Sequence, residues 1–251
     1  MDEQALIQSW EQEEQQPFQG WDFSYLRGRY HESSPPWSYD EKVRQLLQNA
    51  DSLLDMGTGG GEKLLEFRDV FPERTVATEG YPPNIPLATA NLKPFNVPVI
   101  PYNIDEESRM PFDDQSFARI INRHEAYDAR EVARVLKPGG IFCTQQVDGR
   151  DLFDLYSLFG APPSYQHVNL ANCQQELENA GLQIQEALDW QGTATFSDVG
   201  AVVYYLHAVP WQVPPDFSVQ RYQHELVALH RRNSTTFTMR RFFLQAINPK
   251  F

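Results

Sequence analysis

A glycine-rich turn between a short apolar run and a helical pattern constrains this chain more than any other feature. The apolar run 52–56 leads into Gly57-Thr58-Gly59-Gly60-Gly61-Glu62, which opens the helical pattern. Glycine lets the backbone turn tightly and approach a ligand closely, and the N–H groups of a following helix point at that ligand. The turn therefore predicts a nucleotide-like cofactor at the carboxyl end of a strand.

The spacing of these glycines separates two classes of cofactor. A dinucleotide fingerprint, G-x-G-x-x-G, requires its third glycine at the position of Glu62. The chain reads D-x-G-x-G-x-G instead, beginning at Asp55. A carboxylate at this place suits a cofactor with an amino group and a sulfonium better than one with a pyrophosphate. We expect the cofactor to contact Asp55, Gly57, Thr58, Gly59 and Gly61.

Short apolar runs and helical patterns alternate along the rest of the chain, as they do in βαβ units with a parallel sheet. Seven runs predict strands, at 52–56, 75–79, 97–102, 117–123, 140–147, 182–190 and 234–246. Helical patterns cover 38–49, 62–70, 85–92, 129–136 and 170–180, and two more, at 199–207 and 218–231, fall between the sixth and seventh strands. We interpret these two as a helical insertion at about 198–232.

Several segments, taken together, resemble the class I S-adenosylmethionine-dependent methyltransferases of the type 11 kind. The glycine-rich turn is similar to the first motif of this family. The segments 75–79, 110–117 and 131–140, the last reading EVARVLKPGG, resemble later motifs in the same order. The resemblance runs from about residue 40 to 185 and implies an α/β, Rossmann-like, seven-stranded, mostly parallel sheet with helices on both faces. It also implies S-adenosyl-L-methionine as the cofactor.

The resemblance assigns further roles to residues at the ends of the strands. Glu79 matches the acid that binds both ribose hydroxyls, a task that the two oxygens of a carboxylate suit. The neighbourhood 103–105 matches the adenine contact, with Asp105 for the amino group and Ile104 for the ring face. Asn122 and His124 stand at the end of the fourth strand, where the resemblance implies that they face the methionine part of the cofactor and the acceptor.

The acceptor side of the site is less constrained. An imidazole at His124 is a candidate base for an acceptor proton, or it only bonds the backbone and packs on the cofactor. Arg123 and Glu125 form a structural pair or point to solvent; alternatively, the guanidinium holds an acidic substrate or the cofactor carboxylate. Gln145 ends the fifth strand and is placed to line the pocket.

Aromatic residues collect in residues 1–39, which we interpret as a tail followed by an arm or lid in front of a methyltransferase domain at 40–251. The aromatic side chains stack on a flat acceptor or simply pack the arm. They are Trp21, Phe23, Tyr25, Tyr30, Trp37 and Tyr39, of which Trp37 and Tyr39 are the candidate substrate contacts.

Charge and composition bear on the partners. The net charge of −13 opposes nucleic acid, although residues 216–251 carry a net +4. Two cysteines without metal-ligand spacing predict buried thiols and no metal site. The acidic N-terminus and the lack of a long apolar run favour a cytoplasmic protein without membrane contact. We expect a monomer or homodimer.

The prediction is methyl transfer to a small-molecule acceptor by in-line displacement, which needs alignment and no universal catalytic residue. The first alternative is an RNA base methyltransferase, acting on tRNA or rRNA, which would use the basic C-terminal residues. The second alternative is a cofactor-binding protein without transferase activity, or a nicotinamide-dependent oxidoreductase, against which Glu62 counts.

Overall fold

The computed structural model describes residues 2–18, 23–161, 165–232 and 234–249. These residues divide into two compact units. The larger unit comprises 36–147, 168–189 and 241–251, and the smaller unit comprises 1–35, 148–167 and 190–240. The predicted boundary between an arm at 1–39 and a domain at 40–251 stays a prediction, and Trp21 lies outside the described residues.

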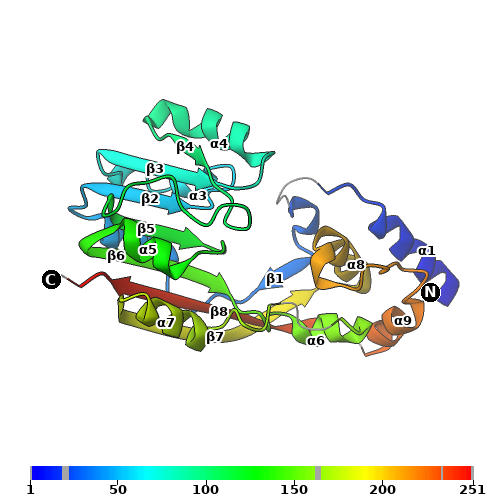
Figure 1. Cartoon of the computed structure of the whole chain (residues 1–251). Coiled ribbons are helices and arrows are strands. Elements are labelled where there is room, and N and C mark those ends of the chain that lie inside the picture. The colour runs from blue at the N-terminus through cyan, green and yellow to red at the C-terminus, as the bar shows by residue number, and fades with distance from the viewer. Residues whose placement is uncertain (1, 19–22, 162–164, 233, 250–251) are drawn as a thin grey trace. The chain divides into compact units, whose positions relative to one another are not determined.

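The larger unit is built on a mostly parallel sheet (Figure 1). Its strands are β2 (Ser52–Met56), β3 (Arg74–Glu79), β4 (Val99–Pro101), β5 (Phe117–Arg123), β6 (Leu136–Val147), and parts of β7 (Gln183–Phe196) and β8 (Thr236–Ile247). They follow the order β7-β8-β6-β5-β2-β3-β4. β4, β3, β2, β5 and β6 pair in parallel, whereas β8 runs antiparallel to β6. The Rossmann-like sheet predicted from the sequence is confirmed.

Helices cover both faces of this sheet. On one face, α2 (Tyr39–Leu47), α3 (Glu62–Leu65) and α4 (Asn84–Leu92) bury their apolar sides in a core that includes Val43, Leu64 and Leu92. On the other face, α5 (Ala129–Val135) and α7 (Leu170–Asn179) pack through Val132 and Leu177. Both cysteines are buried thiols, as predicted.

Side-chain caps begin two helices of the larger unit. The Ser38 hydroxyl accepts the N–H of Glu41 at 3.2 Å and begins α2. The Asp128 carboxylate accepts the N–H of Arg130 at 2.7 Å and of Glu131 at 3.2 Å and begins α5. Side-chain acceptors of this kind satisfy backbone donors that have no partner within the helix.

The smaller unit has its own apolar core. Its helices are α1 (Glu3–Glu14), α6 (Phe153–Tyr156), α8 (Val199–Ala208) and α9 (Gln223–Arg231). Because α8 and α9 lie between β7 and β8, the predicted helical insertion between the sixth and seventh predicted strands is confirmed. An additional strand, β1 (Tyr30–Glu32), pairs antiparallel with β7 from Tyr30 opposite Phe196. The sequence did not indicate β1, because its surroundings are rich in residues typical of loops.

One predicted helix is shorter than expected. The pattern predicted a helix over 62–70, but α3 ends at Leu65 and a 3-10 turn, Arg68–Val70, follows it. The N–H of Phe67 donates to the carbonyl of Leu64, and the N–H of Val70 donates to that of Phe67. These three-residue bonds tighten the chain, so that Leu64 and Phe67 both enter the core.

Candidate functional site

The glycine-rich turn leaves β2 in a conformation that only glycine adopts readily. Gly57, Gly59 and Gly61 have φ angles of 67°, 63° and 86°, in the left-handed region that penalises a Cβ atom. The predicted contribution of a helix N-terminus is small, because α3 spans only four residues. The backbone of the turn itself is therefore the main feature that is offered to a ligand.

Close contacts explain why two glycines stand at the ends of β2 and β3. A Cβ atom on Gly57 would lie 2.3 Å from Cγ of Glu125, and one on Gly80 would lie 2.8 Å from the carbonyl oxygen of Tyr102. Gly61 is different, since a Cβ there would meet Leu92 of α4. Gly61 thus serves the packing of the turn on α4, while Gly57 and Gly80 border an open space.

Glu79 closes the turn with both of its carboxylate oxygens. Oε2 accepts the N–H of Gly59 at 2.6 Å, and Oε1 accepts the N–H of Tyr81 at 2.7 Å. The residue is 5% exposed. Each carboxylate oxygen carries a second lone pair, so that Glu79 is held in place and retains acceptor capacity for two ligand hydroxyls.

Asp55 is a second buried acid at the same edge. Burial, with the nearby charge of Glu79, raises the pKa of Asp55 to about 7. Thr58, beside it in the turn, is also buried, and its hydroxyl partly opposes this rise in the pKa of Asp55. Because a buried carboxylate without a cation is costly, this corner favours a positively charged ligand group.

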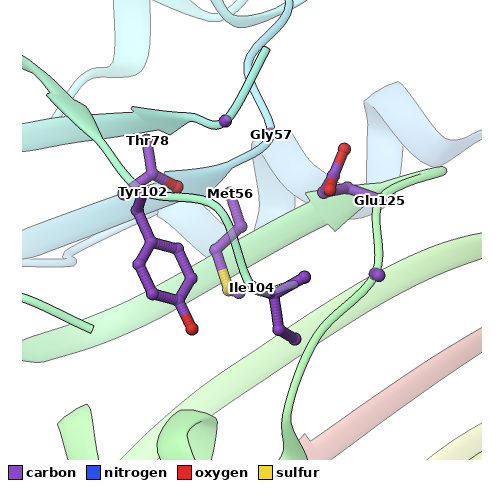
Figure 2. A pocket seen from close by; sticks show the side chains of 8 residues that line it. Met56, Gly57, Thr78, Tyr102, Ile104 and Glu125 are labelled. Atoms are coloured by element: carbon purple, nitrogen blue, oxygen red, sulfur yellow. The ribbon is translucent and has the colours of Figure 1, made fainter. Parts of the chain in front are cut away.

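A small pocket joins these elements. Its walls are Met56, Gly57, Thr78, Gly80, Tyr102, Ile104, Glu125 and Ala126. Figure 2 shows Tyr102 and Glu125 on opposite sides of the pocket, with Met56 and Ile104 between them. Ile104 lies where the sequence placed it, whereas Asp105 is exposed and is not one of the residues that line the pocket.

Glu125 is the site residue that the sequence analysis missed. The sequence suggested a pair with Arg123 or a side chain in solvent; no ion pair joins the two among the described residues, and Glu125 is exposed. Its side chain also lies over Gly57 and lines the pocket. Crowding by protein atoms, with the charges of Glu79 and Asp105, raises its pKa to about 7. Its position two residues after the end of β5 was the feature of the sequence that indicated a place near the site.

A buried polar network lies at the carboxyl ends of β5 and β6. Oδ1 of Asn122 accepts the hydroxyl of Thr144 at 2.8 Å and the amide of Gln146 at 2.6 Å. Asn122 is fully buried, yet its Nδ2 has no partner among the described residues. Buried donors are nearly always hydrogen-bonded. An acceptor atom of a bound ligand would give Nδ2 of Asn122 a partner.

Three of the predicted acceptor-side residues form a hydrogen-bonded chain. The indole N–H of Trp37 donates to Oε1 of Gln145 at 2.9 Å, and Nε2 of Gln145 lies 3.3 Å from Nε2 of His124. Tyr39 is buried, and its phenol is 3.4 Å from the backbone oxygen of Asn122. The structure thus brings Trp37, Gln145 and His124 together and places Tyr39 beneath the end of β5.

His124 has an unusual backbone and a shifted pKa. Its φ is 62°, and its N–H donates to the carbonyl of Gln145 at 2.9 Å. Crowding by protein atoms, together with the guanidinium groups of Arg123 and Arg241, lowers the pKa of His124 to about 3. The residue is exposed at the surface, and the lowered pKa leaves the imidazole neutral at pH 7.

Among the described residues, no three or more His, Cys, Asp or Glu side chains are arranged to hold a metal ion. Within the same part of the chain, no helix has the length and apolar character needed to cross a membrane.

Comparison with known proteins agrees with this geometry. Residues 54–144 match the family model described as a methyltransferase domain. This range begins in β2 and ends in β6, and it includes the glycine-rich turn, Glu79 and Asn122. No curated protein sequence matches the chain significantly.

Solved structures share the fold at low sequence identity. A Bacillus halodurans protein, provisionally assigned as a methyltransferase, is 17% identical with a TM-score of 0.59, covering 84% of this chain and 97% of its own. A SAM-dependent methyltransferase from Aquifex aeolicus is 15% identical with a TM-score of 0.51, covering 99% of both chains. The [4+2]-cyclase SpnF is 16% identical with a TM-score of 0.54, covering 89% of this chain and 88% of its own.

Proposed function

The chain carries a class I S-adenosyl-L-methionine-dependent methyltransferase domain of the type 11 kind, and we propose that this domain methylates a small-molecule acceptor by in-line displacement. The observation that supports the proposal most is the character of two adjoining groups of strand ends, all at the carboxyl ends of the parallel strands; we call each group an edge. One edge, at β2 and β3, is acidic and glycine-lined, and the other, at β5 and β6, carries polar side chains. Open α/β sheets bind ligands at these ends.

The residues at the first edge fit the cofactor. We assign the ribose hydroxyls to Glu79 and the adenine ring to Ile104. We assign the positively charged amino group of the methionine part to Asp55, where a cation would offset the cost of a buried carboxylate. The orphaned donor of Asn122 and the hydroxyl of Thr58 are further candidate contacts. When bound, S-adenosyl-L-methionine supplies a methyl group on a positively charged sulfur.

The chain's own residues contribute positioning and exclusion of water. Methyl transfer needs the acceptor aligned with the methyl group, and a rigid site provides this alignment. Asn122, Thr144 and Gln146 tie the end of β5 to the end of β6, while Trp37 and Gln145 hold His124. The second edge is thus built from side chains that are themselves held by hydrogen bonds.

The basic C-terminal residues give weak support to an RNA acceptor. Arg221 pairs with Asp216 at 2.8 Å, and Arg231 pairs with Glu3 at 2.7 Å. Two of the six basic residues in 216–251 are therefore neutralised within the smaller unit. Since affinity for nucleic acid depends on cations that displace counterions, a chain of net charge −13 favours a small molecule.

The test is to supply S-adenosyl-L-methionine with a radiolabelled methyl group, together with small-molecule, RNA and protein fractions of a cell extract. We expect label in the small-molecule fraction, and its loss with Glu79→Gln. Label in RNA would favour the first alternative instead. Cofactor binding without any transferred label would favour a protein that binds the cofactor but catalyses no transfer. The oligomeric state, monomer or homodimer, stays a prediction.

A further inference from the structure

The ends of β5, β6 and β8 place two guanidinium groups on the same face of the sheet. Arg123 pairs in register with Gln145, and Val147, two residues further along β6, pairs with Arg241. Side chains two apart on a strand share a face. This is the face covered by α2, because Ile121 and Cys143, each two residues before Arg123 and Gln145, lie in the same core as α2.

The hydrogen-bonded chain on this face determines the protonation of His124. An indole N–H is only a donor, so the atom of Gln145 nearest Trp37 is its carbonyl oxygen, and its amide nitrogen faces His124. This amide nitrogen donates, and Nε2 of His124 therefore accepts. In a neutral imidazole the proton then resides on Nδ1.

Two donors at this place have no protein partner. Nδ1 of His124 makes no hydrogen bond within the described residues. The guanidinium of Arg123 likewise makes no hydrogen bond or ion pair there, and lies 6.0 Å from the ring centroid of Tyr39. Arg123 is exposed, and a planar guanidinium recognises a carboxylate or phosphate by two parallel hydrogen bonds.

This donor cluster, Arg123 and His124, is separate from the cofactor pocket. The pocket is lined from the ends of β2 and β3 and by Glu125, and neither Arg123 nor His124 belongs to its walls. In the sheet order, β5 stands between β2 and β6. The cluster therefore lies on the side of β5 that continues toward β6 and β8, away from the ribose ligand Glu79 on β3.

We propose that the methyl acceptor carries an acid group, a carboxylate or a phosphate, and that the guanidinium of Arg123 and the Nδ1–H of His124 hold this group. The inference rests on the proposed function, because it names the substrate class of the same site. It also assigns His124 as a hydrogen-bond donor to the acceptor, in place of the base that the sequence suggested.

The first test is the tautomer of His124, measured by long-range ¹H–¹⁵N correlation spectra of the full chain, with signals assigned by comparison with His124→Ala. We expect a neutral ring protonated on Nδ1 at pH 7, and in Gln145→Ala a change toward a mixture of tautomers. A ring protonated on Nε2, or a doubly protonated ring, would overturn the donor assignment.

The second test is anion binding to the protein saturated with S-adenosylhomocysteine. Inorganic phosphate and acetate serve as probes, and the His124 signals report binding. We expect one or both to bind in the millimolar range, and Arg123→Gln to weaken binding about tenfold, as expected for loss of a charge-assisted bidentate contact. Arg44→Gln is the control, since Arg44 is a partly exposed arginine that is paired with Asp69.

The cofactor's own carboxylate is the rival anion, and two cofactor fragments separate it from the acceptor. If Arg123 holds the acceptor, Arg123→Gln leaves the affinity for S-adenosylhomocysteine unchanged. If it holds the cofactor, the variant loses affinity for S-adenosylhomocysteine but not for methylthioadenosine, which lacks the carboxylate, and the proposal falls. Failure of the wild type to bind S-adenosylhomocysteine would contradict the proposed function itself. Cofactor binding without any anion binding contradicts this inference alone.

Discussion

The edge formed by β2 and β3 and the edge formed by β5 and β6 belong to one sheet, yet they are built in different ways. At the first edge, backbone N–H groups of Gly59 and Tyr81 hold Glu79, and the ionisable groups are acids. At the second edge, side-chain amides, an indole and an imidazole hold one another, and the neighbouring charges are guanidinium groups.

This difference explains which part of the function each edge reveals. A site made from backbone groups needs glycines at fixed places, so its ligand leaves a recognisable spacing in the sequence. A site made from side chains has no such requirement, because its ligand is determined by which side chains come into contact in the folded protein. The first edge therefore identifies the cofactor from the sequence, whereas the contacts of the second edge are recognised only in three dimensions.

The largest effect is expected from Gly57→Ala. The new methyl group would meet Glu125 at 2.3 Å while the backbone stays at a φ of 67°. We expect the affinity for S-adenosyl-L-methionine to fall by about a hundredfold or more, since steric conflict and backbone strain of several kcal/mol act together. Calorimetric titration measures the change.

Gly181→Ala is the matched control for Gly57→Ala. Its φ is 91°, and a Cβ atom there would meet nothing within 4 Å. It carries the backbone strain without the steric conflict, so stability should fall by about 1–2 kcal/mol with cofactor affinity unchanged. Equal losses of affinity in both variants would show that Gly57 has no special relation to the pocket.

Glu79→Gln should have the next largest effect. The amide keeps the size of the side chain but loses the charge and one acceptor, so we expect a 10- to 100-fold loss of cofactor affinity, or about 1.4–2.8 kcal/mol. Asp69→Asn, at an exposed carboxylate paired with Arg44, is the control and should bind normally. Unchanged affinity in Glu79→Gln would remove Glu79 from the cofactor site.

Asp55→Asn should separate stability from binding. The folded-state pKa of Asp55 is raised to about 7, so the folded protein binds more protons than the unfolded chain between about pH 4 and 7. The stability contributed by the protonated form is lost as the pH rises through this window. We expect Asp55→Asn to raise the free energy of unfolding by about 1–2 kcal/mol at pH 8 and to weaken cofactor binding.

Denaturant unfolding at pH 5 and pH 8 checks this prediction. The gain in stability should be present at pH 8 and small at pH 5, where wild-type Asp55 is already protonated. A variant that is less stable than wild type at pH 8 would contradict the burial of an uncompensated charge at Asp55.

Cofactor affinity itself should depend on pH at the first edge. Asp55 and Glu125 both titrate near pH 7, so they are mostly neutral at pH 6 and mostly ionised at pH 8. Because a cationic ligand group favours ionised carboxylates, we expect affinity to rise about five- to tenfold from pH 6 to pH 8. Titrations in Glu125→Gln, which retains only Asp55, should show a shallower dependence.

The smallest effect on cofactor binding is expected at the second edge. Gln145→Ala removes the link between Trp37 and His124 but touches no residue that lines the pocket. We expect the dissociation constant of S-adenosyl-L-methionine to stay within about twofold, while the rate of methyl transfer falls. A loss of affinity as large as that of Glu79→Gln would abolish the distinction between the two edges.

Most of the sheet was predictable, because strands such as β2, β3 and β5 are short apolar runs bounded by turn signals. The departures have local causes. β1 is too short and too polar to show a strand pattern, and α3 ends early because Phe67 turns into the core. β7 extends to Phe196, beyond the predicted end at residue 190, and its residues alternate in burial along most of that length.

Within the site, the backbone-built edge was predictable and the side-chain edge was only partly so. The glycine spacing located Asp55 and Gly57, and the family resemblance located Glu79, at the carboxyl ends of the neighbouring strands β2 and β3. Glu125 was missed, because its side chain lies over a glycine that is 68 positions earlier in the sequence. The tautomer of His124 depends on a contact of Gln145 with Trp37, and no local pattern encodes that contact.

The most direct test of this account is a single set of calorimetric titrations with S-adenosyl-L-methionine, with NAD in parallel, on wild type, Glu79→Gln and Gln145→Ala. The account predicts micromolar binding of S-adenosyl-L-methionine alone, a large loss in Glu79→Gln, and near-normal binding in Gln145→Ala. Binding of NAD instead would contradict the cofactor assignment. Equal loss in both variants would contradict the placement of the cofactor at the ends of β2 and β3 and of the acceptor at the ends of β5 and β6.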